Sequence, residues 1–273
     1  MPPPYTPSQK NAIAQFVSFT HAKDSVAARH LKSHAWNVEQ AVDAFFQSST
    51  GISAPSAQTV ALSKLFDKYR EDAIESPDTI GVEGSMKYLG DLGVNLDEVV
   101  VLAVLAELQA PTMGEFSREG FIQGWKTYSA DTLTKQQALI PQFRRHLTTH
   151  PDFFKRTYKH TFLIARLPGQ KSVALDAAVE YWRLLFSSPS VVAWHTPQTP
   201  WLEWWVEYLE TRWKRGVNRD MWDQTGVFAA RCLGDETMGW WSEDGAWPGV
   251  LDEFVGFVVE KRREAEGERM EVE

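Results

Sequence analysis

The sequence contains only one cysteine, Cys232, so it cannot form an internal disulfide. A chain without disulfides suits a reducing compartment, and we expect an intracellular protein of the cytoplasm, the nucleus or both. No stretch approaches the roughly 18 consecutive apolar residues that a membrane span requires. The N-terminal Met-Pro-Pro-Pro is neither a signal peptide nor a myristoylation start, which needs glycine at position 2. We therefore expect a soluble protein with no membrane partner.

The sequence also lacks an excess of positive charge. It has 28 Lys and Arg against 36 Asp and Glu, which gives a formal net charge of -8. A nucleic-acid-binding protein usually presents a basic face that neutralises phosphates. This balance argues against nucleic acid as the main partner, although it is compatible with a local basic patch.

The motifs of common enzymes are missing. The sequence has no G-x-S-x-G, S-x-x-K or H-E-x-x-H, and the glycines of GVEGSMKYLG fit neither a Rossmann nor a P-loop spacing. Cys232 has no neighbouring catalytic signature, so we interpret it as a buried structural thiol. His146 and His150 have the i, i+4 spacing of metal ligands but lack a nearby third ligand and a general base. We expect no catalytic residues of its own, no metal and no cofactor.

Convincing strand patterns are absent, and helical periodicity dominates, so the sequence predicts an all-α fold. Residues 8–47 contain three short amphipathic runs, typical of a small three-helix bundle, with Thr6 and Asn37 among the candidate N-caps. Residues 48–59 are rich in Ser, Gly and Pro, which is typical of a flexible linker. A larger helical domain over 60–263 and a disordered tail over 264–273 complete the expected organisation.

Two stretches of the larger domain resemble calcium-binding helix-loop-helix hands. Aligning Ile80 and Phe116 with the central apolar position of the 12-residue loop allows the ligand positions to be checked. They fall on Ala73, Pro77 and Gly84 in the first loop and on Gln109, Pro111, Met113 and Gly120 in the second. These residues supply almost no side-chain oxygen, so we expect EF-hand-like helix pairs without calcium.

Tryptophan and acidic residues gather near the C-terminus. Nine of the twelve tryptophans lie between residues 194 and 247, where they form either a thick core or an interface. Residues 234–254 contain no Lys, Arg or His and six acidic residues: Asp235, Glu236, Glu243, Asp244, Asp252 and Glu253. This segment is either a solvated acidic face or a docking face for a basic partner.

The same region resembles a known family. NRDMWDQ at 218–224 and WWSEDGAWPGVLDEFVGFV at 240–258 are similar to the signature of the defective-in-cullin-neddylation family. Six further segments, which precede these motifs in the chain, also occur in the family's order: LFDKYRE, IGVEG, EFSREGF, IPQFRRHL, FKRTYKHTFLIAR and PGQKSVALDAAVEYWRLLF. The resemblance therefore covers about residues 60–260. SFT and WNVEQAVDAFFQ near the N-terminus resemble the family's ubiquitin-associated three-helix module.

The resemblance implies a function. It indicates a scaffold-type ligase that promotes transfer of the ubiquitin-like modifier Nedd8 from its conjugating enzyme to a cullin lysine. The implied partners are the cullin C-terminal domain, the N-terminally acetylated conjugating enzyme, the RING subunit of cullin ligases and ubiquitin. The alternative is a ubiquitin-binding adaptor that docks a peptide helix and has no ligase role.

Site residues are implied by position in the family pattern. The cullin-binding acidic patch falls on Asp220, Ala246 and Asp252. The pocket for the acetylated methionine of the conjugating enzyme falls on Val82, Ser85, Tyr88, Val101, Leu102, Val104, Leu108, Met113, Phe116, Ile164, Tyr181 and Leu184. As ordinary core residues, this second group would look the same. Ubiquitin binding falls on Phe19 and Thr20, where the chain reads SFTHAKD instead of the usual Met-Gly-Phe or Met-Gly-Tyr loop.

Overall fold

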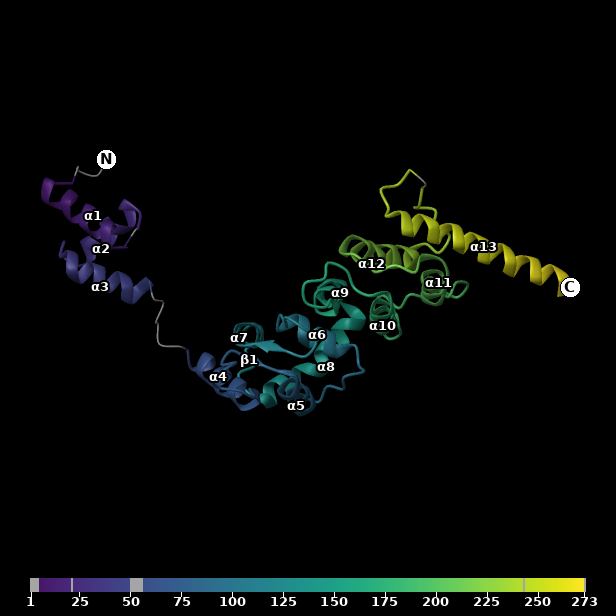
Figure 1. Ribbon diagram of the computed structural model, residues 1–273, viewed down its shortest axis with the longest axis horizontal. Helices are drawn as coiled ribbons and strands as arrows, with labels where there is room; N and C mark the ends of the chain where they lie inside the picture. Colours follow the sequence, from purple (N-terminus) through teal and green to yellow (C-terminus); the bar gives the residue numbers. More distant parts are fainter. Residues whose placement is uncertain (1–4, 21, 50–55, 243, 273) are drawn as a thin grey trace. The chain divides into compact units, whose positions relative to one another are not determined.

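The computed structural model describes residues 5–20, 22–49, 56–242 and 244–272, and it is mainly α-helical, which confirms the expected fold class. The chain divides into two compact units, residues 1–60 and 61–273 (Figure 1). Among the described helices, none is both long enough and apolar enough to cross a membrane. Each unit has its own hydrophobic core.

The first unit is a three-helix bundle of α1 (Pro7–Thr20), α2 (Asp24–Ser33) and α3 (Val38–Ser49). Its core is built around Phe16, which is fully buried and forms a cluster of three mutually contacting rings with His30 and Phe45. Thr6 and Gln9 form a reciprocal capping box, since each accepts a hydrogen bond from the other's backbone N–H, at 3.3 and 3.0 Å. The Asn37 side chain caps α3 by accepting from the Gln40 N–H at 3.1 Å. The caps predicted at Thr6 and Asn37 are therefore confirmed, whereas Ser8 and Asp24, the other two candidates, lie within α1 and α2.

The predicted linker, residues 48–59, is helical at both of its ends. The last two residues of α3 occupy positions 48 and 49, and α4 (Ala57–Tyr69) begins before residue 60. The Ser56 hydroxyl accepts a hydrogen bond from the Thr59 N–H at 3.2 Å, so a serine that contributes to the linker-like composition is a helix cap. Residues 50–55 lie outside the described part of the chain.

The second unit begins with two helix-loop-helix segments. The first contains α4, β1 (Thr79–Ile80) and α5 (Val82–Leu92), and the second contains α6 (Val100–Glu107), β2 (Phe116–Ser117) and α7 (Arg118–Thr127). The two short strands are antiparallel, and Ile80 pairs with Phe116, the two residues at the central apolar positions of the loops. The EF-hand interpretation itself stays a prediction.

Protein side chains close the loops of these two segments. The Glu71 carboxylate accepts the N–H groups of Gly81 and Gly84, each at 2.7 Å. Burial raises the pKa of Glu71, but the hydrogen bonds from Gly84 and Gly81 outweigh it, and the pKa lies below its usual value. Arg118, the first residue of α7, forms ion pairs with Asp78 of the first loop and with Asp67 of α4, both at 2.7 Å.

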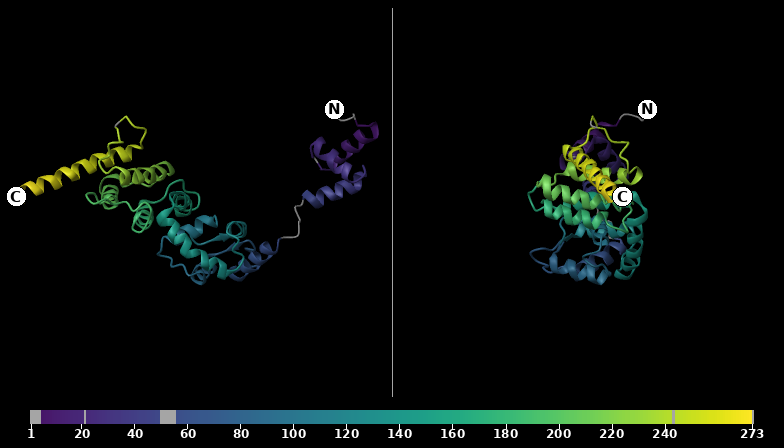
Figure 2. Two further views of the ribbon diagram at one scale, coloured as in Figure 1. Left: turned by 180° about the vertical axis from the view of Figure 1, so that it is seen from behind. Right: turned by 90° about the vertical axis from the view of Figure 1, so that its right-hand side faces the viewer.

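Two of the remaining helices pack on α6, and the others build the tryptophan-rich end. The remaining helices are α8 (Leu133–Thr149), α9 (Pro151–Ala165), α10 (Leu175–Phe186), α11 (Trp201–Tyr208), the π-helical turn η1 (Leu209–Trp213), α12 (Arg219–Gly234) and α13 (Gly249–Val272), as Figure 2 shows from two further sides. Helix α6 is buried from Val100 to Leu105 and packs against α8 and α9, as its all-round apolar sequence predicts. All nine tryptophans between residues 194 and 247 are at least partly buried, which favours the core interpretation for most of them.

The C-terminal tail differs from the sequence prediction. Helix α13 continues to Val272, whereas the sequence predicts disorder over 264–273. The tail lacks an apolar stripe, but its Glu, Arg, Ala and Met residues are strong helix formers. A helix nucleated by the buried stripe from Val250 to Val258 can therefore extend through them. Glu273 lies outside the described residues.

Candidate functional site

Asp220 lies in the first turn of α12, and its side chain is exposed. The residue in the cap position, Asn218, accepts the Met221 N–H at 2.8 Å and thereby fixes the start of the helix. A carboxylate near a helix N-terminus interacts favourably with the helix dipole, which is a structural reason for an aspartate at this position. The helix dipole stabilises the Asp220 carboxylate without neutralising it, so its negative charge remains available to a partner.

Asp252 lies in the first turn of α13 and is partly exposed. The indole N–H of Trp241 donates a hydrogen bond to Asp252 Oδ1 at 3.1 Å. Within the described part of the chain, no ion pair involves Asp252. The indole therefore orients this carboxylate without neutralising it.

Ala246 is exposed in the loop between α12 and α13, directly before Trp247. The Trp247 ring packs edge-on against Phe228 of α12, with ring centroids 5.7 Å apart. The Arg231 guanidinium lies 5.4 Å from the ring centroids of both Trp247 and Trp240. These contacts hold the loop to α12 and present the small Ala246 side chain to solvent.

Two of the other acidic residues of this segment, Asp235 and Glu236, stabilise nearby turns and loops. Asp235 accepts hydrogen bonds from the Thr237 N–H and hydroxyl and from the Gly239 N–H, and the Thr237 hydroxyl in particular lowers its pKa. Glu236 accepts the hydroxyls of Thr196 and Thr199, at 2.6 and 3.0 Å, and the Thr196 bond lowers its pKa most.

Glu253 is also engaged, because it accepts the Tyr208 hydroxyl at 2.8 Å. Asp244 is exposed, and Glu243 lies outside the described residues. Hydrogen bonds from neutral donors therefore fix the positions of Asp235, Glu236 and Glu253 but leave these groups negatively charged.

Two of the three positions expected to bind a cullin, Ala246 and Asp252, lie close together in the sequence. Ala246 and Asp252 flank Trp247 and belong to one loop and helix start. Asp220 lies on α12, eight residues before Phe228, the residue that contacts Trp247. Eight residues correspond to about 12 Å along the helix axis. We call Asp220, Ala246 and Asp252, the three positions at which the family resemblance predicts cullin docking, the acidic docking face.

Most residues of the expected acetyl-methionine pocket are core residues in the structure. Val82 is 57% exposed, whereas Met113, Tyr181 and Leu184 are partly buried. The other eight are buried: Ser85, Tyr88, Val101, Leu102, Val104, Leu108, Phe116 and Ile164. Ser85 is notable among them because its hydroxyl has no hydrogen-bond partner among the described residues.

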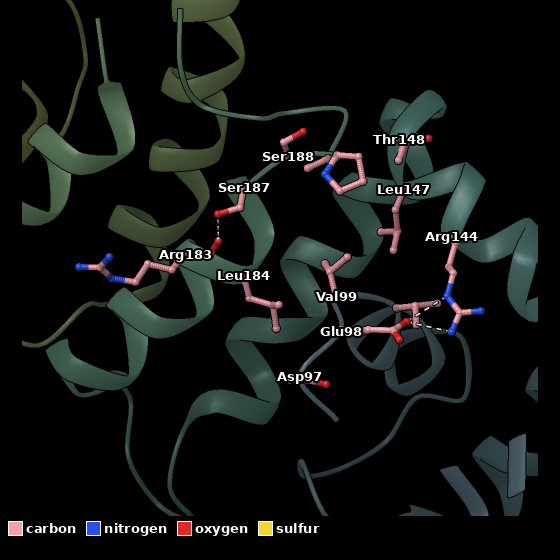
Figure 3. Close-up of a pocket in the computed structure, with 13 residues that line it drawn as sticks. Asp97, Glu98, Val99, Arg144, Leu147, Thr148, Arg183, Leu184, Ser187 and Ser188 are labelled. Carbon is pink, nitrogen blue, oxygen red and sulfur yellow. Dashed lines mark hydrogen bonds and ion pairs between the residues drawn. The ribbon is translucent and has the colours of Figure 1, made fainter. Parts of the chain in front are cut away.

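A cavity of about 430 Å³ lies beside this group, and Leu184 lines it (Figure 3). Its walls come from residues 97–100, α8, α10 and residues 187–190, and Leu147 of α8 contributes to its apolar surface. Arg144 at the rim is paired with Glu98 at 2.8 Å, whereas Arg183 has only a 3.9 Å approach to Glu180. The sequence identifies Leu184 but not the other lining residues, which come from four separate segments.

The two candidate ubiquitin-binding residues have different surroundings. Phe19 is 65% exposed at the end of α1. Thr20 is partly buried, and its hydroxyl donates to the Phe16 carbonyl at 2.8 Å and accepts the Ala22 N–H at 3.3 Å. Phe19 therefore offers an apolar contact surface, while Thr20 terminates the helix.

The alternative chemical sites are not supported by geometry. Cys232 is fully buried, and this burial raises the pKa of its thiol to about 12, so it stays protonated at neutral pH. The rings of His146 and His150 are 4.3 Å apart, but no group of three His, Cys, Asp or Glu among the described residues could hold a metal ion.

Comparisons with known proteins identify the families that this chain matches. Residues 135–257 match a family described as cullin binding, and residues 10–51 match a family described as a UBA-like domain. The chain is 33% identical over 268 residues to Defective in cullin neddylation protein 1 of Pyricularia oryzae, covering 94% of this chain and 95% of that relative.

Two further relatives extend this similarity. The protein of the same name from Yarrowia lipolytica is 34% identical over 248 residues, covering 91% of this chain and 96% of its own length. DCN1-like protein 3 of Rattus norvegicus is 32% identical over 230 residues, covering 82% of this chain and 70% of that relative.

Proposed function

The chain belongs to the defective-in-cullin-neddylation family, with a role in cullin neddylation, and we propose that it is a scaffold-type ligase for this reaction. It would bind a cullin and the modifier-charged conjugating enzyme together, while a separate RING subunit activates the thioester. Holding two reactants in one complex raises their effective concentration and requires no covalent step. The proposed role requires an intracellular location.

The oriented, unpaired carboxylate of Asp252 is the observation that carries the proposal. Asp252 takes part in no ion pair within the described residues, and a neutral indole N–H holds it at the start of α13, next to the loop that carries Ala246. Its charge is available for a basic cullin surface, and the small Ala246 permits close approach. We propose that the cullin C-terminal domain docks on the acidic docking face.

We propose that the acetylated methionine of the conjugating enzyme enters at Leu184, where the expected pocket meets the cavity of about 430 Å³. Cavities of this size can hold a small ligand group. Acetylation converts an N-terminal ammonium into a neutral amide, which costs much less to remove from water. The apolar surface of Val99, Leu147 and Leu184 would then favour the acetylated over the free N-terminus.

Calorimetry with N-terminal peptides of the conjugating enzyme tests the pocket. The acetylated peptide should bind at least about 30-fold more tightly, corresponding to about 2 kcal/mol for an uncompensated polar group. Leu184→Asp should remove most of this difference, while Leu167→Asp, a change at an exposed leucine outside the cavity, should preserve it. Equal affinities of acetylated and free peptides would refute this location.

Multiple-turnover neddylation of a cullin, with and without the chain, tests the ligase role. The initial rate should rise with chain concentration and then fall at high excess, since a scaffold in excess binds the two partners separately. A rate that stays unchanged at every chain concentration, from well below to above saturation of cullin binding, would rule out the ligase proposal.

A ubiquitin-binding adaptor is the second candidate, favoured by the exposed Phe19 and by the match of residues 10–51 to a UBA-like domain. The adaptor would bind ubiquitin and leave the neddylation rate unchanged. Phe19→Ala should weaken ubiquitin binding, while Val60→Ala, a change at another exposed apolar residue, should not. Undetectable ubiquitin binding by the unaltered chain would remove this candidate.

A further inference from the structure

A groove of about 350 Å³ lies between α9 and α12, two helices that pack together in the second unit (Figure 1). Its floor includes the apolar side chains of Phe154, Tyr158 and Val192, which are buried in the core. Val227 of α12, 44% exposed, lines the groove from the other helix. The groove therefore offers an apolar surface that a single large side chain could cover.

The floor of the groove is fixed by the core. The Tyr158 hydroxyl donates to the Trp222 carbonyl at 2.6 Å and accepts the Trp182 indole N–H at 3.0 Å. Gly226 allows α12 to lie directly on this ring, since a Cβ there would come within 2.7 Å of Tyr158 Cε1. A ligand would meet a preformed surface and would not have to order it.

The rim of the groove is basic, although the chain as a whole carries a net charge of -8. Lys155 and Lys159 of α9 and Arg231 of α12 line it, and no ion pair in the described ranges involves any of the three. The one lining carboxylate, Asp223, is itself 3.8 Å from Arg219. Three unneutralised cations beside an apolar floor favour a ligand that combines carboxylates with an apolar side chain.

We propose that this groove binds an acidic peptide segment of another protein, with an aromatic or aliphatic side chain on its floor and carboxylates at Lys155 and Lys159. The basic cullin surface proposed for the acidic docking face would be repelled here, so the groove serves a different partner. The groove and the acidic docking face border each other on α12, because Val227 lies two turns beyond Asp220 on the same side of the helix and Arg231 lines the groove while also packing on Trp247. A concave floor favours a peptide over a flat anionic membrane surface.

A peptide library tests the proposal although the natural partner is unidentified. Random 12-residue peptides displayed on phage would be selected on the full chain, and the enriched peptides would be synthesised and titrated by fluorescence anisotropy. The test variant is Lys155→Glu with Lys159→Glu, because Arg231 also supports the Trp247 loop. The matched control is Lys87→Glu with Lys171→Glu, which makes the same charge change at two exposed lysines outside the groove.

We expect enriched peptides to combine an excess of Asp and Glu with an aromatic or aliphatic residue. The test variant should weaken their binding about tenfold or more, and the control variant much less, because it changes only the long-range field. Ala230→Trp, which places an indole at the groove, should block binding independently of charge. Circular dichroism would verify that each variant is folded.

Two results would overturn the proposal. Enriched peptides without an acidic excess, or with equal affinity for the test variant, would show that the groove is not their site. Vesicles of phosphatidylserine and phosphatidylcholine provide the other test. Binding of the chain to these vesicles through Lys155 and Lys159, with no acidic peptide enriched, would assign the basic rim to a membrane surface.

Discussion

Replacing Asp252 with asparagine separates docking from folding. Asn keeps an oxygen that can accept the Trp241 indole N–H, currently 3.1 Å from Asp252 Oδ1, but it removes the negative charge. The folded state loses a favourable interaction with the α13 N-terminus and part of the strength of a hydrogen bond to a charged group. These contributions amount to about 0.5–1 kcal/mol at a partly exposed position. For a domain of this size, the melting temperature should fall by about 2–4 °C per kcal/mol.

Asp252→Asn should weaken cullin binding by much more than it lowers the stability of the fold. Removing one member of an interfacial charge pair typically costs about 2–5 kcal/mol, since the partner's charge is then desolvated without compensation. The lower value corresponds to a roughly 30-fold weaker complex. Titration of the cullin C-terminal domain at two salt concentrations provides the assay, and the salt dependence should be smaller for the variant than for the unaltered chain.

Glu253→Gln is the matched control because it makes the same charge change at the next residue. Glu253 accepts the Tyr208 hydroxyl at 2.8 Å, and Gln can keep that bond. We expect Glu253→Gln to change cullin affinity by about twofold or less, through the long-range field only. Equal loss of affinity in the two variants would refute the view that Asp252 is the oriented contact, and unchanged affinity in both would refute docking at this face.

Three further results are expected. Trp247→Ala should lower the free energy of unfolding by about 3 kcal/mol, the lower end for a large aromatic because Trp247 is only partly buried; chemical denaturation would check this, and an unchanged midpoint would contradict it. Ser85→Ala should leave stability unchanged or raise it by about 1 kcal/mol, since it removes a buried hydroxyl without a partner; a clear loss in the same denaturation assay would contradict this. Cys232 should resist iodoacetamide at pH 8, because burial raises its pKa to about 12 and the reactive thiolate gains population only as the pH rises toward that value; rapid alkylation of the folded chain would contradict this.

The parts of the fold that the sequence predicts depend on local patterns. The amphipathic runs, the Thr6 and Asn37 caps and the all-apolar α6 are recognisable within one or two helical turns. The lack of an apolar stripe predicts disorder after Arg263, but helix propensity extends α13 to Val272.

The chemistry of the site depends on contacts between distant segments. Glu253 contributes to the acidic composition, but its hydrogen-bond partner Tyr208 is 45 residues away in the chain. The groove combines Lys155 and Lys159 of α9 with Val227 of α12, and neither segment alone shows a concave surface. Local patterns can indicate which residues are charged or apolar, but not which of them remain unpaired after folding.

The most direct test of the proposed two-surface scaffold is one multiple-turnover neddylation experiment. The unaltered chain and Asp252→Asn would each be assayed with acetylated and with free conjugating enzyme, at a chain concentration below saturation. Stimulation should be strong only for the unaltered chain with the acetylated enzyme, because a scaffold that has lost either partner cannot bring the two together. Full stimulation by Asp252→Asn, or with the free conjugating enzyme, would contradict the two-surface scaffold.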